Sequence, residues 1–411
     1  MRSFLAECLR LVLSGGRAYR AWVAFLLCAV GVGIAGWVHQ ARTGLIVTSL
    51  RDEVSWGFYI GNFTFLVGVA AAAVMLVIPA YVYHWKPIKE VVVLGEILAV
   101  SAMVMCLLFI LADMGRPDRF LHLVPLLGTP NWPRSLLTWD AMVLNLYLVL
   151  NLAVALHVLH RAFRGRDPDR RFFVPLVLFT IPVAIGIHTV TAFLFSGMVA
   201  RPYWNASILA PRFLASAFAS GPAVMIVLFQ ILRRTIAFPI RDEALWKIAE
   251  LMAWAMFVNL FLLGAELFKE FYSATDHLKF TAHVWTGLGG HRALVPFAWT
   301  GLACSVVAFA LLLVPRTRRR FATLNAGCVL IWIGVYLEKG FLLVVGGLSP
   351  DALGVIHDYR PSPTELAVAA GVFGVGFLVF TGLVKIAVPI LYGTFRAETV
   401  TPGSVTESLV A

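Results

Sequence analysis

The sequence contains few charged residues. Asp, Glu, Lys and Arg make up 13% of its 411 residues, whereas 60% are hydrophobic and the mean hydropathy is +0.86. A soluble chain of this length could not cover its surface with so few charges and would aggregate. The composition therefore excludes a soluble protein and indicates an integral membrane protein.

The cysteines are few and scattered. The five are Cys8, Cys28, Cys106, Cys304 and Cys328. No two of them stand at CxxC spacing, and an iron–sulfur cluster needs several thiolates in a close set. We therefore expect no iron–sulfur cluster in this chain.

Histidines placed to hold a haem are also lacking. A b-type haem in a helical bundle needs axial ligands, usually His, at matching depth on facing helices. His157 and His188 lie within predicted membrane spans but near opposite faces of the membrane. We therefore expect no haem. His188 is either a hydrogen-bonded core residue or a participant in redox or proton chemistry.

Long apolar runs dominate the chain instead. A helix needs roughly 20 apolar residues to cross a bilayer. Ten segments qualify, at about 20–38, 56–83, 91–112, 136–157, 172–195, 211–236, 245–269, 294–314, 321–345 and 364–392. We predict an all-α, polytopic membrane protein with about ten transmembrane helices.

A faint internal repeat suggests how these helices are grouped. Glu96 and Glu250 each stand about five residues into a span, and Asp113 and Glu266 follow near its end. Two related four-helix bundles would give this pattern. The predicted domains are residues 1–55 (tail and first helix), 56–200 (first bundle), 201–345 (second bundle) and 346–411 (last helix and C-terminal tail).

The basic residues indicate how the chain is oriented. The net charge of +11 comes from short Lys and Arg clusters between apolar spans, which argues against a nucleic-acid footprint. With the N-terminus inside, 20 of the 33 Lys and Arg residues fall in inner segments and 11 in outer loops. The positive-inside rule then predicts that both termini are cytoplasmic. The long outer loops at about 113–135, 270–293 and 346–363 suggest a docking surface for an extracytoplasmic partner.

Ionisable side chains inside the spans are the candidate functional residues, because burying charge in a bilayer is costly. Those toward the outer side are Asp113, Asp140, His188, Glu266, Glu338 and Lys339. Those toward the inner side are Glu96, Glu250 and Lys385. Two interpretations remain open. The groups form interhelical ion pairs that only lock the bundle, or they line an outer polar pocket joined to a partial proton path.

The segment DMGRPDRFLH, at residues 113–122, is the most distinctive local motif. Pro117 disfavours helical geometry at Arg116, and Gly115 permits a tight turn at the helix exit. The arginines and Asp113 could bracket a polar ligand or pair with each other.

At this motif the chain resembles the NrfD/polysulfide-reductase family of membrane subunits. The matching segments are 113–120 (DMGRPDRF), 135–140 (SLLTWD), 144–152 (LNLYLVLNL), 56–70, 287–299, 336–340 (YLEKG) and 384–390 (VKIAVPI). The resemblance implies two four-helix bundles with flanking helices, no haem or cluster in this subunit, and a quinone site near the outer face. Relatives in alternative complex III carry a His where residues 68–73 read GVAAAA, so no role of that His transfers here.

Within the family the chain is most similar to the DsrP subunits of DsrMKJOP complexes. This implies sulfur metabolism in a bacterial inner (cytoplasmic) membrane. The implied partners are a ferredoxin-like iron–sulfur subunit (DsrO-like) outside the membrane, a multihaem cytochrome c (DsrJ-like), and DsrM-like and DsrK-like subunits. The implied cofactor is a quinone, menaquinone or ubiquinone.

We therefore expect a membrane subunit that exchanges electrons between quinone and the iron–sulfur partner, with proton conduction as a further role and no redox chemistry from the isolated chain. The predicted quinone-binding residues are Asp113, Arg116, His122, Asp140, His188 and Glu338. The predicted proton-path residues are Glu96, Glu250, Glu266 and Lys385. Two alternatives are a purely structural anchor for redox subunits and a secondary transporter, whose binding helices are usually broken near the middle by Gly or Pro.

Overall fold

The structure is a computed structural model. It describes residues 2–395 except 84, 86, 87, 89, 90, 125, 126 and 237–239, so the tail predicted to follow the last helix lies largely outside the described residues. The described residues form helices and loops and no strand, which confirms the all-α prediction.

Ten helical segments in the described part of the chain are long and apolar enough to cross a membrane, in agreement with the ten predicted spans. Seven are single helices: α2 (Arg17–Thr43), α6 (Val92–Asp113), α7 (Leu136–Phe163), α8 (Arg170–Ser196), α9 (Leu209–Thr235), α10 (Asp242–Ser273) and α12 (Val295–Leu313). The last span is also a single helix, α16 (Pro363–Leu391).

Two of the spans are composite. The second consists of α3 (Phe58–Ala70), α4 (Ala72–Val77) and a π-helical turn, η2 (Ile78–Val82). The ninth consists of α14 (Phe321–Val335), the π-helix η4 (Tyr336–Leu342) and α15 (Leu343–Leu348). The turn η2 contains Pro79, whereas η4 contains no proline. π-Helical turns inside α-helices are frequent at functional sites.

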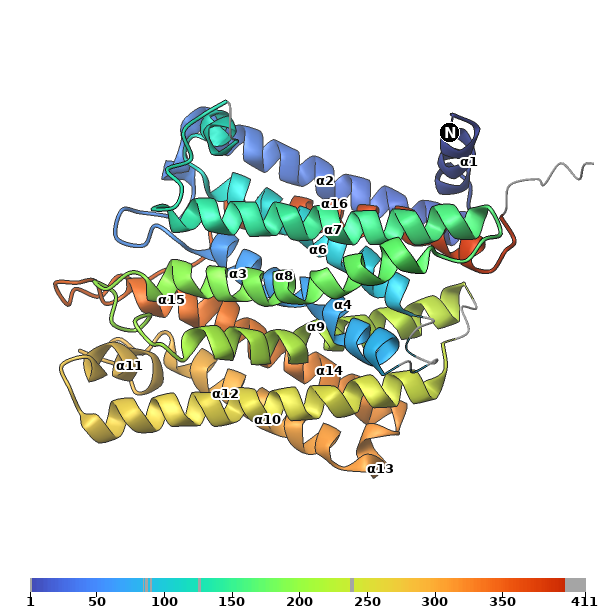
Figure 1. Ribbon diagram of the computed structural model, residues 1–411. Coiled ribbons are helices and arrows are strands. Elements are labelled where there is room, and N and C mark those ends of the chain that lie inside the picture. The colour runs from blue at the N-terminus through green and yellow to red at the C-terminus, as the bar shows by residue number, and fades with distance from the viewer. Residues whose placement is uncertain are drawn as a thin grey trace, which may run out of the picture.

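Short helices mark the two ends of the molecule. The helix α11 (Leu278–Trp285) lies at one end, and α13 (Pro315–Arg318) lies at the other (Figure 1). The 3₁₀ segments η1 (Leu45–Val47) and η3 (Pro117–Leu123) belong to loops. The N-terminal α1 (Arg2–Leu13) stands across the direction of α2 at the α13 end (Figure 1).

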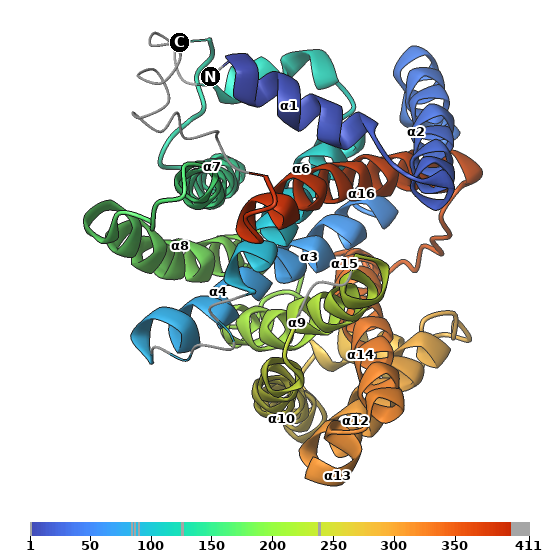
Figure 2. The same ribbon diagram turned by 90° about the vertical axis from the view of Figure 1, so that its right-hand side faces the viewer.

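The helices pack in two groups. In the first, α3 packs on α6, α6 on α7, and α7 on α8; in the second, α9 packs on α10 and α14, and α12 packs on α10 and α14. The groups meet where α3 contacts α9 and η4, and α16 lies between α2 and α6 (Figure 2). The division of the chain at residues 200 and 345 stays a prediction.

Glycines let some of these helices approach closely. A Cβ atom added at Gly33 on α2 would lie 2.4 Å from Cα of Gly371 on α16. A Cβ atom at Gly61 on α3 would lie 2.1 Å from the carbonyl oxygen of Gly340 on η4. Membrane helices gain much of their association energy from such close backbone packing, because lipid supplies no hydrophobic drive between helices.

Gly33→Val tests the α2–α16 contact. We expect a loss of about 1–3 kcal/mol of stability, because the added side chain overpacks a backbone contact, and a lower melting temperature in detergent. Gly31→Val is the matched control, since nothing lies within 4 Å of a Cβ atom at this exposed position of the same helix. Equal melting temperatures for the two variants would contradict the contact.

Candidate functional site

A charged network joins three helices of the second group. Arg212 of α9 forms an ion pair with Glu266 of α10, and its Nη2 atom lies 2.7 Å from Oε1 of Glu338 in η4. Asn259 of α10 donates to the other oxygen of Glu338 at 3.1 Å. Nζ of Lys339 lies 3.4 Å from Oε1 of Glu338, and the side chain is only 4% exposed. Two acids and two bases therefore balance their charges within the membrane.

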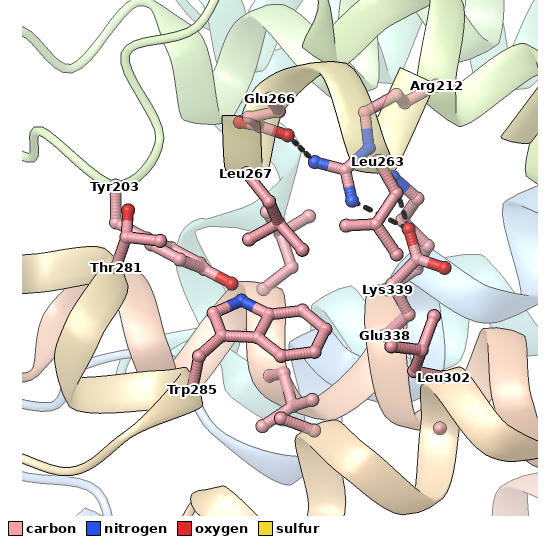
Figure 3. A pocket seen from close by; sticks show the side chains of 14 residues that line it. Tyr203, Arg212, Leu263, Glu266, Leu267, Thr281, Trp285, Leu302, Glu338 and Lys339 are labelled. Carbon is pink, nitrogen blue, oxygen red and sulfur yellow. Dashed lines mark hydrogen bonds and ion pairs between the residues drawn. The ribbon is translucent and has the colours of Figure 1, made fainter. Parts of the chain in front are cut away.

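The network lines a cavity. Tyr203 lies in the loop before α9, Thr281 and Trp285 lie on α11, and Leu263 and Leu267 of α10 close the space between these residues and the network (Figure 3). The cavity measures about 30 Å³, which is room for water but less than the 300–1,000 Å³ typical of ligand pockets. Because α11 lies at the end of the molecule opposite α13, the cavity belongs to the end that the charge distribution predicts to be extracytoplasmic (Figure 1).

Tyr203 is a neutral hydrogen-bond donor at this cavity. Burial raises the pKa of its hydroxyl to about 12, and the neighbouring Arg212 guanidinium opposes this shift. The phenol therefore keeps its proton throughout the physiological range.

A second, smaller cavity lies next to the network. Lys339 lines both cavities, and the second, of about 10 Å³, is also lined by His188 of α8 and by Thr64, Ser216 and Ser220. Nδ1 of His188 is 2.7 Å from the carbonyl oxygen of Ala184, so this nitrogen carries the proton and Nε2 is an acceptor. Nε2 of His188 and Nζ of Lys339 are both buried without a hydrogen-bond partner among the described residues.

Asp113 lies in a different polar cluster, between α2, α3, α6 and α16. Tyr59 donates to Gln40 at 2.7 Å, and Gln40 donates to the carbonyl oxygen of Ala112 at 2.7 Å. The carboxyl of Asp113 interacts electrostatically with that of the buried Glu365, which Tyr359 hydrogen-bonds. Burial and then the Glu365 carboxylate raise the pKa of Tyr359 above its ordinary value.

The other predicted quinone-binding residues lie apart from both clusters. Asp140 of α7 is buried and accepts a 2.7 Å hydrogen bond from Thr191 of α8. Arg116 pairs with Asp118 at 2.7 Å, with both side chains well exposed, and His122 is exposed. The structure thus brings Glu338 to the first cavity and His188 to the second, and does not bring the six residues together.

The predicted proton-path residues are also dispersed. Glu266 lies in the charged network. Glu96 is 1% exposed on α6, and neither of its carboxyl oxygens has a partner among the described residues. Glu250 pairs with Lys247 at 3.4 Å, and Lys385 binds the carbonyl oxygen of Ser14 and lies over the ring of Tyr19. The path through these four residues stays a prediction.

Three residues of the network and its cavity were not predicted from the sequence. Arg212 stands in the first turn of its span, where an arginine is expected at the membrane interface. Asn259 and Tyr203 are uncharged, so a search for ionisable groups within the spans passes over them.

Comparison with known proteins gives consistent matches along the chain. Residues 46–350 match the family described as "Polysulphide reductase, NrfD". The chain is 29% identical to a putative dimethyl sulfoxide reductase membrane subunit of Halobacterium salinarum, covering 90% of this chain and 92% of the relative. It is 22% identical to a selenate reductase subunit of Mesobacillus selenatarsenatis (86% and 91% covered). It is 21% identical to the Hdr-like menaquinol oxidoreductase integral membrane subunit of Archaeoglobus fulgidus (90% and 93% covered).

Arg212→Met tests the charged network. The change leaves Glu266 without its cation, whereas Glu338 keeps Lys339. Breaking a buried ion pair in this way costs about 3–5 kcal/mol, so we expect a clearly lower melting temperature. The further change Glu266→Gln removes the unpaired charge and should restore most of the loss. Arg116→Met, at an exposed ion pair, should leave the melting temperature unchanged. A single Arg212→Met variant as stable as the wild type would contradict the network.

Proposed function

Because the chain belongs to the NrfD family of polysulphide-reductase membrane subunits, we propose that it exchanges electrons with quinone at the cavity beside Arg212, Glu266 and Glu338. It is a multi-span integral membrane protein, and two of its relatives are named as reductase subunits. Another relative is named for menaquinol. The observation that carries the proposal is a charge-balanced polar network that faces a cavity between helices that span the bilayer.

The residues around the cavity suit a quinone headgroup. A quinone offers two carbonyl oxygens that accept hydrogen bonds on an otherwise apolar ring. Nζ of Lys339 is a buried donor without a hydrogen-bond partner among the described residues, and Tyr203 supplies a neutral hydroxyl. Leu263, Leu267 and Leu302 supply apolar walls. Since the cavity is smaller than a ring, binding requires these leucine side chains to move.

Quinone reduction consumes two electrons and two protons, so the site must also handle protons. Glu338 and Glu266 share one guanidinium, so a proton taken up by either carboxylate leaves the other still paired with Arg212. The two carboxylates are therefore suited to hold and release a proton at the cavity. Lys339 and His188, which face the second cavity, extend this polar chain inward, and we propose proton conduction through them.

Two substitutions test the proposal in the purified complex. Tyr203→Phe removes one hydroxyl without altering charge or shape and should raise the KM for quinone about three- to tenfold, the value of one hydrogen bond. Glu338→Gln should lower quinone-linked turnover on the order of a hundredfold, because it removes a proton-carrying group. Arg164→Gln, at an exposed position at the opposite end of the molecule, should alter neither constant.

The outcome also separates the alternatives. If Asp113→Asn abolishes turnover while Tyr203→Phe and Glu338→Gln do not, the headgroup binds at the cluster of Asp113 and Glu365. If none of these changes affects electron transfer, the chain is a structural anchor. A Soret band in the spectrum of this chain alone would contradict the expectation that it holds no haem.

We further propose that the complex acts on sulfur compounds in the bacterial inner membrane, with both termini cytoplasmic. Its partners would be DsrO-like iron–sulfur, DsrJ-like multihaem cytochrome, DsrM-like and DsrK-like subunits. The sequence segments at 56–70, 287–299, 336–340 and 384–390 support this branch of the family. Affinity purification of the chain from native membranes tests it. Recovery of a molybdenum-containing reductase in place of the multihaem cytochrome would overturn the Dsr-type assignment.

A further inference from the structure

The end of the molecule opposite the cavity carries an unpaired basic surface. The segment from α13 to the start of α14 reads PRTRRR and contains no acid. Arg316, Arg319 and Arg320 are exposed, and none of them forms an ion pair with another described residue. We call these three residues the arginine cluster.

Three neighbouring charged residues pair with one another. Arg318 donates to the carbonyl oxygens of Leu312 and Leu313, at the end of α12, and lies 3.9 Å from Glu250. Lys247 also pairs with Glu250, so this carboxylate has two cationic neighbours. The local acid is therefore neutralised, and the arginine cluster keeps its full positive charge.

An aromatic row leads from the arginine cluster into the membrane. The guanidinium of Arg319 lies over the ring of Trp246 at 5.7 Å. Trp254, Phe257 and Phe261 follow at 8, 11 and 15 residues along α10, a spacing that keeps all four rings on one side of the helix. All three are strongly exposed, Trp254 by 59% and Phe261 by 63%. At 1.5 Å per residue the row is about 22 Å long, more than the half-thickness of a bilayer core.

We propose that the arginine cluster and the aromatic row together bind one anionic phospholipid. The phosphate lies against Arg316, Arg319 and Arg320, and an acyl chain lies along Trp254, Phe257 and Phe261. Guanidinium groups match phosphate oxygens in a bidentate manner, and indole rings favour the headgroup level of a bilayer. Nε1 of Trp246, whose ring lies under Arg319, is a buried donor without a partner among the described residues.

A second basic loop at the same end serves as an internal control. Arg164 and Arg166 lie between α7 and α8, Arg170 begins α8, and all three are equally exposed. However, Asp167 and Asp169 are interleaved with them, and Arg161 already binds the carbonyl oxygen of Asp167. The positive-inside rule applies to both loops alike. If the lipid site is specific to the arginine cluster, neutralising that cluster should weaken lipid binding and neutralising the second loop should not.

The test uses the full chain in its complex, purified in mild detergent. Phosphatidylglycerol, phosphatidylcholine and inorganic phosphate are added separately, and lipid binding is followed by native mass spectrometry and by the melting temperature. Phosphatidylglycerol alone should bind and raise the melting temperature. The triple variant Arg316→Gln/Arg319→Gln/Arg320→Gln should bind it on the order of a hundredfold more weakly, because each basic residue near an anionic surface contributes about fivefold to affinity. Arg164→Gln/Arg166→Gln/Arg170→Gln should bind as the wild type does.

Three results would overturn the proposal. They are equal losses in the two triple variants, equal binding of phosphatidylcholine, and loss of a protein subunit from the complex while phosphatidylglycerol is retained. Where the triple variant fails to accumulate, Arg319→Lys and Trp254→Ala replace it. Arg319→Lys keeps the charge but not the planar guanidinium, and Trp254→Ala removes one ring of the aromatic row. Each change should weaken phosphatidylglycerol binding severalfold.

Discussion

A guanidinium held between two carboxylates inside the bilayer is the interaction on which the second half of the molecule depends. Charged groups in lipid are tolerated only when they are paired or face a cavity, and Arg212, Glu266 and Glu338 meet both conditions. The pairing fixes α9, α10 and η4 relative to one another, since each contributes one charge.

The remaining architecture serves to bring these charges together. Glycine contacts draw η4 against α3, and the π-helix places Glu338 and Lys339 on the same cavity although they are adjacent in sequence. Because Lys339 also lines the second cavity with His188, the network reaches the first helix group. We propose that the end of the molecule with the cavity exchanges electrons and protons, while the opposite end, with its arginine cluster, binds a lipid headgroup.

The membrane spans were predictable from the sequence because bilayer thickness sets the length of an apolar run. Glu266, Glu338 and His188 were recognisable as candidate site residues because they are ionisable groups within such runs. Their grouping was not predictable. Asp113, although equally distinctive in sequence, lies beside Glu365 because α16 packs against α6, a contact between segments about 250 residues apart. Arg212 was indistinguishable from an interfacial arginine, and η4 is too short for any periodicity to reveal it.

The location of the quinone site is the central claim, and photoaffinity labelling of the purified complex with an azido-quinone tests it most directly. Irradiation followed by peptide mapping reports which helices contact the ring. The account predicts modified residues on α10, α12 and η4, near Leu263, Leu302 and Lys339, and competition of the label by unmodified quinone. Labelling confined to α2, α6 and α16, around Asp113 and Glu365, or labelling that unmodified quinone does not reduce, would contradict it.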